Sequence, residues 1–216
     1  MATYIAKEIK CATATKKDAG LAGLAKTNGY CIAGNESVCG VCRSFFQYDL
    51  SGISNVEVRS ALLHLFVEDV PATFGKRHLG KITSDWEEEN VTWNNMPSYS
   101  KIAEFDEPGR GWYTVDVTDI VKEWLDKHNN NGFVICYSSE SYVGSYIKYT
   151  NRYSTTAPQN ASYIEIDYVG AEYYRISEQS LVALGDQARR ISGNTGYLSV
   201  AEMIDIFASV PVEEIT

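Results

Sequence analysis

The sequence has little positive charge and no long apolar run. Its 19 Lys and Arg residues stand against 28 Asp and Glu residues, which gives a net charge of −9. Because phosphate groups and anionic lipids are bound by basic surfaces, this balance argues against nucleic acid as a partner. The uncharged apolar runs are far shorter than the roughly 18–20 residues that a transmembrane helix needs, so we expect no membrane insertion. The N-terminal residues also lack the apolar stretch of about 7–15 residues that marks a secretory signal.

What is present is the composition of a folded, β-rich protein. The 216 residues are 44% hydrophobic and include 16 Gly but only 5 Pro, which excludes disorder and a collagen-like structure. The 15 Tyr and 4 Trp residues lie in stretches that are rich in Val, Thr and Ser. Aromatic and β-branched residues suit half-buried pleated surfaces, so we expect mostly strands.

The cysteine count is odd, so the five thiols cannot all pair within one chain. We interpret them as reduced thiols of a protein that is made and assembled in a cytoplasm. Cys39 and Cys42 form a CxxC motif, and Cys11 and Cys31 could complete a zinc site. The second pair lacks CxxC spacing, so ordinary buried thiols are the favoured interpretation and Cys39 and Cys42 stay weak metal candidates.

No other metal or cofactor motif is present. The three histidines are far apart and show neither HxH nor HExxH spacing, and there is no glycine-rich phosphate loop. Sandwich domains can hold a structural calcium ion, for which Asp18, Asp49 and Asp167 are candidate ligands. We otherwise expect no cofactor.

Residues 1–169 alternate with the period of β-strands. In residues 61–67 both faces of the alternation are apolar, which predicts a central strand covered on both sides. One helix interrupts the pattern after Thr118, with Ile120, Val121, Trp124 and Leu125 on one face. Residues 129–132, Asn-Asn-Asn-Gly, should end this helix. We expect it to cap one end of an antiparallel, jelly-roll-like β-sandwich.

From about residue 170 the period becomes helical. Residues 170–216 predict a linker and a small helix-turn-helix hairpin that cannot hold a core alone. Ser199 and Glu202 form a capping box at the start of its second helix. The spacing of its apolar residues predicts a seam for homo-oligomerisation. The seam residues are Leu181, Leu184, Ala188, Ile191, Met203 and Phe207.

Several segments resemble the DNRLRE (disaggregatase-related) β-sandwich family. They are residues 31–35, 43–51, 58–65, 84–97 and 113–121, of which 84–97 carries the most specific motif, with Trp86 and the run VTWNNMP. The resemblance covers nearly all of residues 15–169. It implies a jelly-roll-like accessory domain of the kind found in surface proteins and polysaccharide lyases, some of which are similar to carbohydrate-binding modules.

Residues 176–203 resemble a hairpin that recurs at the ends of tail and minor structural proteins of Firmicutes phages and prophages. The sequence departs from that pattern at Gly185 and Gln187, which weakens the first helix. The combination implies a non-enzymatic virion structural protein of the tail tip, baseplate or fibre, with other virion proteins as partners. A capsid decoration protein is an alternative, and the expected location is the virion, assembled in the host cytoplasm.

Catalysis has little support in the sequence. Glu87, Glu88 and Glu89 could suggest a glycosidase pair, but adjacent strand residues point to opposite faces, and the family motif implies a structural turn. No serine lies in a GxSxG elbow. A polysaccharide-degrading enzyme would rest on the association with lyases alone, so we expect no enzymatic activity.

The best binding feature is a polar stretch that contains five tyrosines. Flat rings beside hydroxyl, amide and charged groups suit both sugar recognition and protein interfaces. The candidates are Tyr137, Tyr142, Tyr146, Tyr149 and Tyr153. Glycan contact, a protein interface and a purely structural role all remain open. A carbohydrate-binding module that recognises a cell-surface polysaccharide is therefore the alternative to the virion role.

Overall fold

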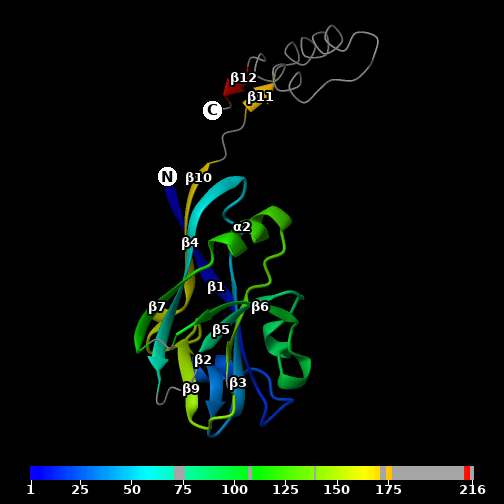
Figure 1. Cartoon of the computed structure of the whole chain (residues 1–216), viewed down its shortest axis with the longest axis vertical. Helices are drawn as coiled ribbons and strands as arrows, with labels where there is room; N and C mark the ends of the chain where they lie inside the picture. Colours follow the sequence, from blue (N-terminus) through cyan, green and yellow to red (C-terminus); the bar gives the residue numbers. More distant parts are fainter. Residues whose placement is uncertain (71–75, 107–108, 139, 171–173, 177–211, 215–216) are drawn as a thin grey trace, which may run out of the picture. The chain divides into compact units, whose positions relative to one another are not determined.

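A computed structural model of the chain describes residues 1–70, 76–106, 109–138, 140–170, 174–176 and 212–214 (Figure 1). The chain forms two compact units, Met1–Val169 and Gly170–Thr216, which are considered separately. Among the described residues, no helix is both long enough and apolar enough to cross a membrane.

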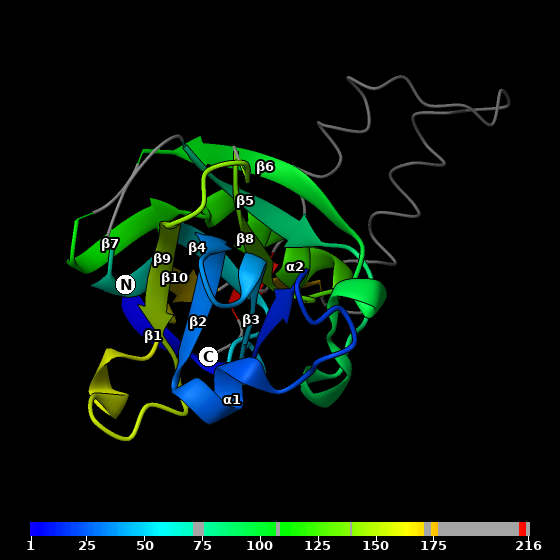
Figure 2. The same ribbon diagram turned by 90° about the horizontal axis from the view of Figure 1, so that it is seen from below.

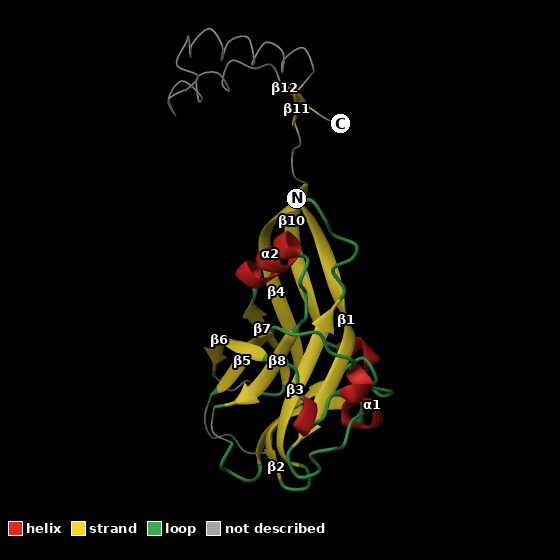
Figure 3. Cartoon of the chain, turned by 90° about the vertical axis from the view of Figure 1, so that its right-hand side faces the viewer, coloured by secondary structure: helices red, strands yellow, loops and turns green. Residues whose placement is uncertain are grey.

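The first unit is mainly β. Its strands are β1 (Ala2–Thr15), β2 (Tyr30–Glu36), β3 (Gly40–Tyr48), β4 (Val56–Asp69), β5 (Arg77–Ile82), β6 (Tyr99–Phe105), β7 (Gly111–Asp116), β8 (Phe133–Tyr137), β9 (Ser145–Thr150) and β10 (Tyr163–Gly170). Its α-helices are α1 (Leu24–Asn28) and α2 (Thr118–Lys127). Figure 3 shows α2 toward one end of the strands and α1 toward the other.

Six of these strands close into a barrel rather than forming the expected jelly-roll-like sandwich. The ring runs β1-β10-β4-β9-β2-β3 and returns to β1. Strands β8, β5 and β6 extend the sheet from β3. Strand β7 pairs with residues 62–67 of β4. In Figure 2, β6 and α1 lie on opposite sides of the barrel. The prediction of a mainly β fold is thus confirmed, whereas the sandwich architecture is corrected to a barrel with extra strands.

Closure of the barrel depends on the long strand β1. Residues 2–7 of β1 pair with β10, and residues 8–15 pair with β3. The register shifts between Glu8 and Lys10, where the partner of β1 changes. Irregularities of this kind bend a strand and increase its twist. The bend allows β1 to pair with β10 along its first half and with β3 along its second half. No periodicity within β1 itself reveals this double pairing.

Strand β4 has one buried face and one partly exposed face. Ala61, Leu63, Leu65 and Val67 are buried and form part of the main core. The opposite face, with Leu62, His64 and Phe66, is only half-buried within the first unit. The expectation that β4 is covered on both sides is therefore wrong, and its outer face is a surface of the barrel.

Helix α2 confirms the expected amphipathic helix, but its C-terminal end differs from the prediction. Val121 and Trp124 are buried, as the spacing predicts. The Asp116 carboxylate, just before the helix, accepts hydrogen bonds from the backbone N–H of Thr118 at 2.9 Å and from its hydroxyl at 2.7 Å. At the other end His128, rather than one of the following asparagines, takes the left-handed conformation with φ 53°.

In the second unit, β11 (Tyr174–Ile176) pairs antiparallel with β12 (Val212–Glu214). This short ladder brings the two ends of the C-terminal region together. The predicted oligomer seam lies outside the described residues, so its helical hairpin stays a prediction. Its members are Leu181, Leu184, Ala188, Ile191, Met203 and Phe207.

Candidate functional site

Two of the five candidate tyrosines are core residues. Tyr137 is 2% exposed and Tyr149 is fully buried. Tyr149 packs edge-on against Phe46, and the Tyr137 hydroxyl accepts a hydrogen bond from Ser145 at 2.8 Å. These two rings therefore support the barrel and offer no surface to a ligand.

Tyr153 stabilises a buried carboxylate. Its hydroxyl donates to Glu88 at 2.6 Å, and Arg152 donates to the same oxygen at 2.6 Å. The other oxygen of Glu88 accepts the backbone N–H of Cys11. Burial alone would raise the pKa of Glu88, but these hydrogen bonds lower it, so the carboxylate stays charged. Glu88 thus links its loop to β1 and to the segment after β9.

The remaining two tyrosines lie nearer to solvent. Tyr142 is 57% exposed in the turn between β8 and β9. Tyr146 is half-buried on β9, and the Lys148 ammonium lies 5.3 Å from its ring centre and 4.8 Å from that of Tyr30. This arrangement keeps a cation near two phenol rings, but only Tyr142 is largely exposed among the five.

A second aromatic surface is formed by residues that the sequence did not single out. Its members, which we call the aromatic platform, are Phe66, His64, Trp112 and Tyr163. The His64 ring stacks on that of Tyr163 with centroids 4.5 Å apart, and Trp112 lies edge-to-face with Phe66 at 5.3 Å and with Tyr163 at 5.5 Å. Trp112 is 46% exposed, while His64, Phe66 and Tyr163 are half-buried beside it.

The platform is assembled by pairing between strands. β4 and β7 run antiparallel with Phe66 opposite Trp112 and His64 opposite Thr114. Because side chains alternate between the two faces of a strand, these four point to the same outer face. β10 lies on the other side of β4 and contributes Tyr163. The signal that could have revealed this surface is the apolar outer face of residues 62–66, which was assigned to a buried layer instead.

Polar groups border the platform. The Glu165 carboxylate lies 3.7 Å from Nε2 of His64, and the Thr114 hydroxyl lies 3.3 Å from its Nδ1. Burial lowers the pKa of His64 more than Glu165 raises it, so the imidazole is neutral at pH 7. Aromatic faces beside a carboxylate, a hydroxyl and a neutral imidazole can pack against the C–H groups of a sugar and bind its hydroxyls.

The described residues contain no group of three or more His, Cys, Asp or Glu side chains that could hold a metal ion. Burial raises the pKa of Cys39, and that of Cys42 to about 12, which disfavours the thiolates that bind zinc. The aspartates considered for calcium lie on separate elements: Asp18 follows β1, Asp49 follows β3 and Asp167 lies on β10.

Two curated proteins of Bacillus subtilis are similar to this chain. They are the tRNA nuclease WapA of strain 168 and the tRNA(Glu)-specific nuclease WapA of subspecies natto (strain BEST195), each 27% identical over 163 residues. The match covers 73% of this chain but 6% of each relative, so the chain spans only a small part of their length.

A family profile matches most of the first unit. The profile of carbohydrate-binding module family 96 covers residues 32–169, from β2 to β10. This match does not name the DNRLRE family or a phage family, and those two resemblances stay predictions. It includes all three strands of the aromatic platform. Because the match extends over more than half of the 216 residues, the chain belongs to carbohydrate-binding module family 96.

Proposed function

We propose that the barrel is a non-catalytic carbohydrate-binding domain and that a glycan lies on the aromatic platform. Membership of a carbohydrate-binding family supports the alternative drawn from the sequence over the virion role. The observation that carries the site is Trp112, which is 46% exposed yet held by Phe66, His64 and Tyr163. A ring that is already fixed loses little freedom when a sugar packs on it.

The test compares two exposed aromatic residues. Purified full-length protein is screened against neutral, amino-bearing and acidic polysaccharides by affinity electrophoresis, and the best ligand is then titrated by calorimetry. Trp112→Ala should weaken binding at least about fivefold, since removal of a well-packed aromatic contact costs about 1–3 kcal/mol. Tyr142→Ala is the matched control and should leave affinity unchanged.

The reverse result would show that the glycan binds outside the aromatic platform. If Tyr142→Ala abolished binding and Trp112→Ala did not, the glycan would lie on the tyrosine-rich stretch and the platform would be excluded. Circular dichroism and thermal melting of both variants establish that each is folded. Incubation with the bound polysaccharide should release no reducing ends, because the proposal involves binding without bond cleavage.

A finer proposal places this glycan on a host cell and the chain in a phage particle. It is supported by the resemblance of residues 176–203 to phage tail hairpins. The proposed partners are other virion proteins and further copies of the chain. Labelled protein that binds selectively and saturably to certain Firmicutes strains would support host recognition. Failure to bind any strain at micromolar concentration would contradict it.

A further inference from the structure

Two thiols lie together in the core of the barrel. Cys11 of β1 is 1% exposed and Cys31 of β2 is fully buried, and both belong to the main core. The Cys11 thiol is within hydrogen-bonding reach of the Cys31 thiol and of the Glu8 carboxyl group. Beside this pair the two strands touch directly, because the Thr13 hydroxyl accepts the backbone N–H of Ile32 at 3.2 Å. All five cysteines are free in the structure, so the pair is a reduced dithiol.

Each cysteine of this pair is held by a polar neighbour. The backbone N–H of Cys11 donates to Oε1 of Glu88 at 2.7 Å. The Asn151 amide donates to Sγ of Cys31 at 3.6 Å and to the carbonyl of Ala25 at 3.0 Å. These hydrogen bonds keep the two cysteines from moving apart within the core.

The other three cysteines are placed differently. Cys39, in the turn between β2 and β3, is within hydrogen-bonding reach of Cys42, but a bond there would enclose only residues 40 and 41 of one hairpin. The Cys136 thiol donates to the Tyr99 hydroxyl at 3.7 Å. A bond between positions 11 and 31 would enclose residues 12–30 and join two strands that do not neighbour each other in the ring. Because a cross-link constrains the unfolded chain more when it closes a longer loop, this pair has the larger effect on the fold.

We propose that Cys11 and Cys31 form a disulfide when the chain folds in the presence of an external disulfide such as oxidised glutathione, and that this bond fastens β1 to β2. One cysteine thiolate attacks the external disulfide, forms a mixed disulfide and releases one glutathione thiolate. The other cysteine thiolate then attacks the sulfur of the first and displaces the second glutathione thiolate. The two cysteines are oxidised, the external disulfide is reduced to two thiols, and the two cysteine protons pass to the released thiolates.

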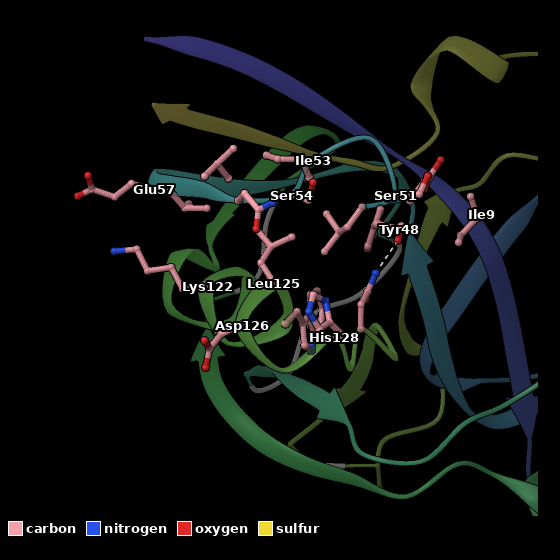
Figure 4. Close-up of a pocket in the computed structure, with 17 residues that line it drawn as sticks. Ile9, Tyr48, Ser51, Ile53, Ser54, Glu57, Lys122, Leu125, Asp126 and His128 are labelled. Atoms are coloured by element: carbon pink, nitrogen blue, oxygen red, sulfur yellow. Dashed lines mark hydrogen bonds between the residues drawn. The ribbon is translucent and has the colours of Figure 1, made fainter. Parts of the chain in front are cut away.

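The bond has to form before β1 is fully packed. Both cysteines are covered in the finished barrel, and the cavity of about 770 Å³ beside α2 is lined by Ile9 of β1 and Tyr48 of β3 but by neither cysteine (Figure 4). The neighbouring Cys31 thiol, burial and Glu8 all raise the pKa of the Cys11 thiol, which disfavours the attacking thiolate once it is enclosed. The oxidant therefore reacts with the folding chain, and the finished barrel then shields the bond from reductants.

Peptide mapping tests whether the bond forms. The full chain is refolded from denaturant in a mixture of oxidised and reduced glutathione, its remaining thiols are alkylated, and it is digested with trypsin without reduction. We expect residues 11–16 to be linked to residues 27–43, which contain Cys31 but also Cys39 and Cys42. A double variant with Cys39→Ser and Cys42→Ser removes this ambiguity and should give the same cross-link.

Thermal melting tests whether the bond fastens β1. The double variant is melted after folding with oxidised glutathione and after folding with a reductant, and the oxidised sample should melt roughly 5–10 °C higher. Cys31→Ala in this background should abolish the difference. Cys136→Ala is the matched control, because it removes another buried thiol but leaves the pair intact, so the difference should persist.

Three results would overturn the proposal. The first is alkylation of both Cys11 and Cys31 in protein that has folded with oxidised glutathione. The second is a cross-link that disappears in the double variant, because Cys11 would then have joined position 39 or 42. The third is an equal melting temperature of the oxidised and reduced samples, which would show that the bond does not fasten β1. The mapping needs no substitution at position 11 or 31, so it decides the question even if Cys31→Ala fails to fold.

Discussion

The carboxyl group of Glu8 is buried in the barrel wall, and each of its two oxygens accepts a hydrogen bond. Oε1 accepts the backbone N–H of Arg152 at 2.9 Å, and Oε2 accepts the hydroxyl of Ser162. Tyr48 in turn donates to Ser162 at 3.0 Å. Burial raises the pKa of Glu8 to about 7, although the hydrogen bonds oppose this rise. The charged form is thus disfavoured in the folded protein but not in the unfolded chain.

Stability should therefore fall as pH rises from 4.5 to about 7, because in that window the unfolded chain releases the Glu8 proton first. The loss amounts to about 3 kcal/mol once pH exceeds the folded pKa. Glu8→Gln should lack it, since the amide does not titrate: its oxygen can accept the Arg152 N–H, and its NH₂ group can donate to the Ser162 oxygen. Urea unfolding at pH 5 and pH 8 measures the difference between the two proteins.

His64 and His78 are present in both proteins, so their own titration cancels in this comparison. Burial lowers the pKa of each histidine, which makes the protein more stable as pH rises through 6.5 and opposes the trend from Glu8. Parallel pH profiles for the unchanged protein and Glu8→Gln would show that Glu8 is not the responsible group.

Gly132 is a position where backbone geometry requires glycine. Its φ is 86°, and a Cβ atom there would lie 2.0 Å from the carbonyl oxygen of Phe46. Gly132→Ala should destabilise the domain by at least about 2 kcal/mol, through both strain and displacement of β3. Gly20→Ala is the control, because nothing lies within 4 Å of a Cβ at that position. Equal melting temperatures for the two variants would contradict the prediction.

At the scale of elements, the start of α2 depends on a residue outside the helix. Asp116 accepts hydrogen bonds from the N–H and hydroxyl of Thr118, and these bonds lower its pKa. Asp116→Ala should cost about 1 kcal/mol, because it removes the two hydrogen bonds that hold Thr118, the first residue of α2. Asp85→Ala, at an exposed loop position, should cost less than about 0.5 kcal/mol. Chemical denaturation measures both.

The sequence predicts those elements whose signal is local. The 3–4 spacing of Val121 and Trp124 places a helix correctly because both residues face one core. The alternation in β4 identifies the buried side chains but not what covers its other face. His64 illustrates this limit: an imidazole in an apolar strand looks like a core residue, yet it stacks on Tyr163 at the barrel surface.

The aromatic platform could not be predicted for a related reason. Phe66, Trp112 and Tyr163 come from three strands separated by more than 40 residues each, and only pairing of β7 and β10 with β4 brings them together. The tyrosine-rich stretch is conspicuous because it is continuous in sequence. Continuity says nothing about exposure, and Tyr137 and Tyr149 in that stretch are buried.

At the scale of the whole unit, the folded barrel is larger than the family match. The match begins at Ile32, whereas β1 precedes it and pairs with both β10 and β3. Residues 32–169 expressed alone should therefore fail to fold, while residues 1–169 should give a cooperative thermal transition. Dispersed amide spectra from residues 32–169 would contradict this prediction and show that β1 is dispensable.

Closure by β1 also determines when the domain can form during synthesis. Ala2 pairs with Tyr168 and Lys7 with Tyr163, so the contacts that complete the ring join the start of β1 to β10, more than 150 residues further along the chain. Such distant pairing makes folding slow, because a long loop must be ordered before these contacts form. On the ribosome, β1 can pair with β3 early, but its other half has no partner until β10 has left the exit tunnel. From the synthesis of β1 until β10 emerges, the nascent domain therefore carries an open sheet edge, which disappears only when the barrel is complete.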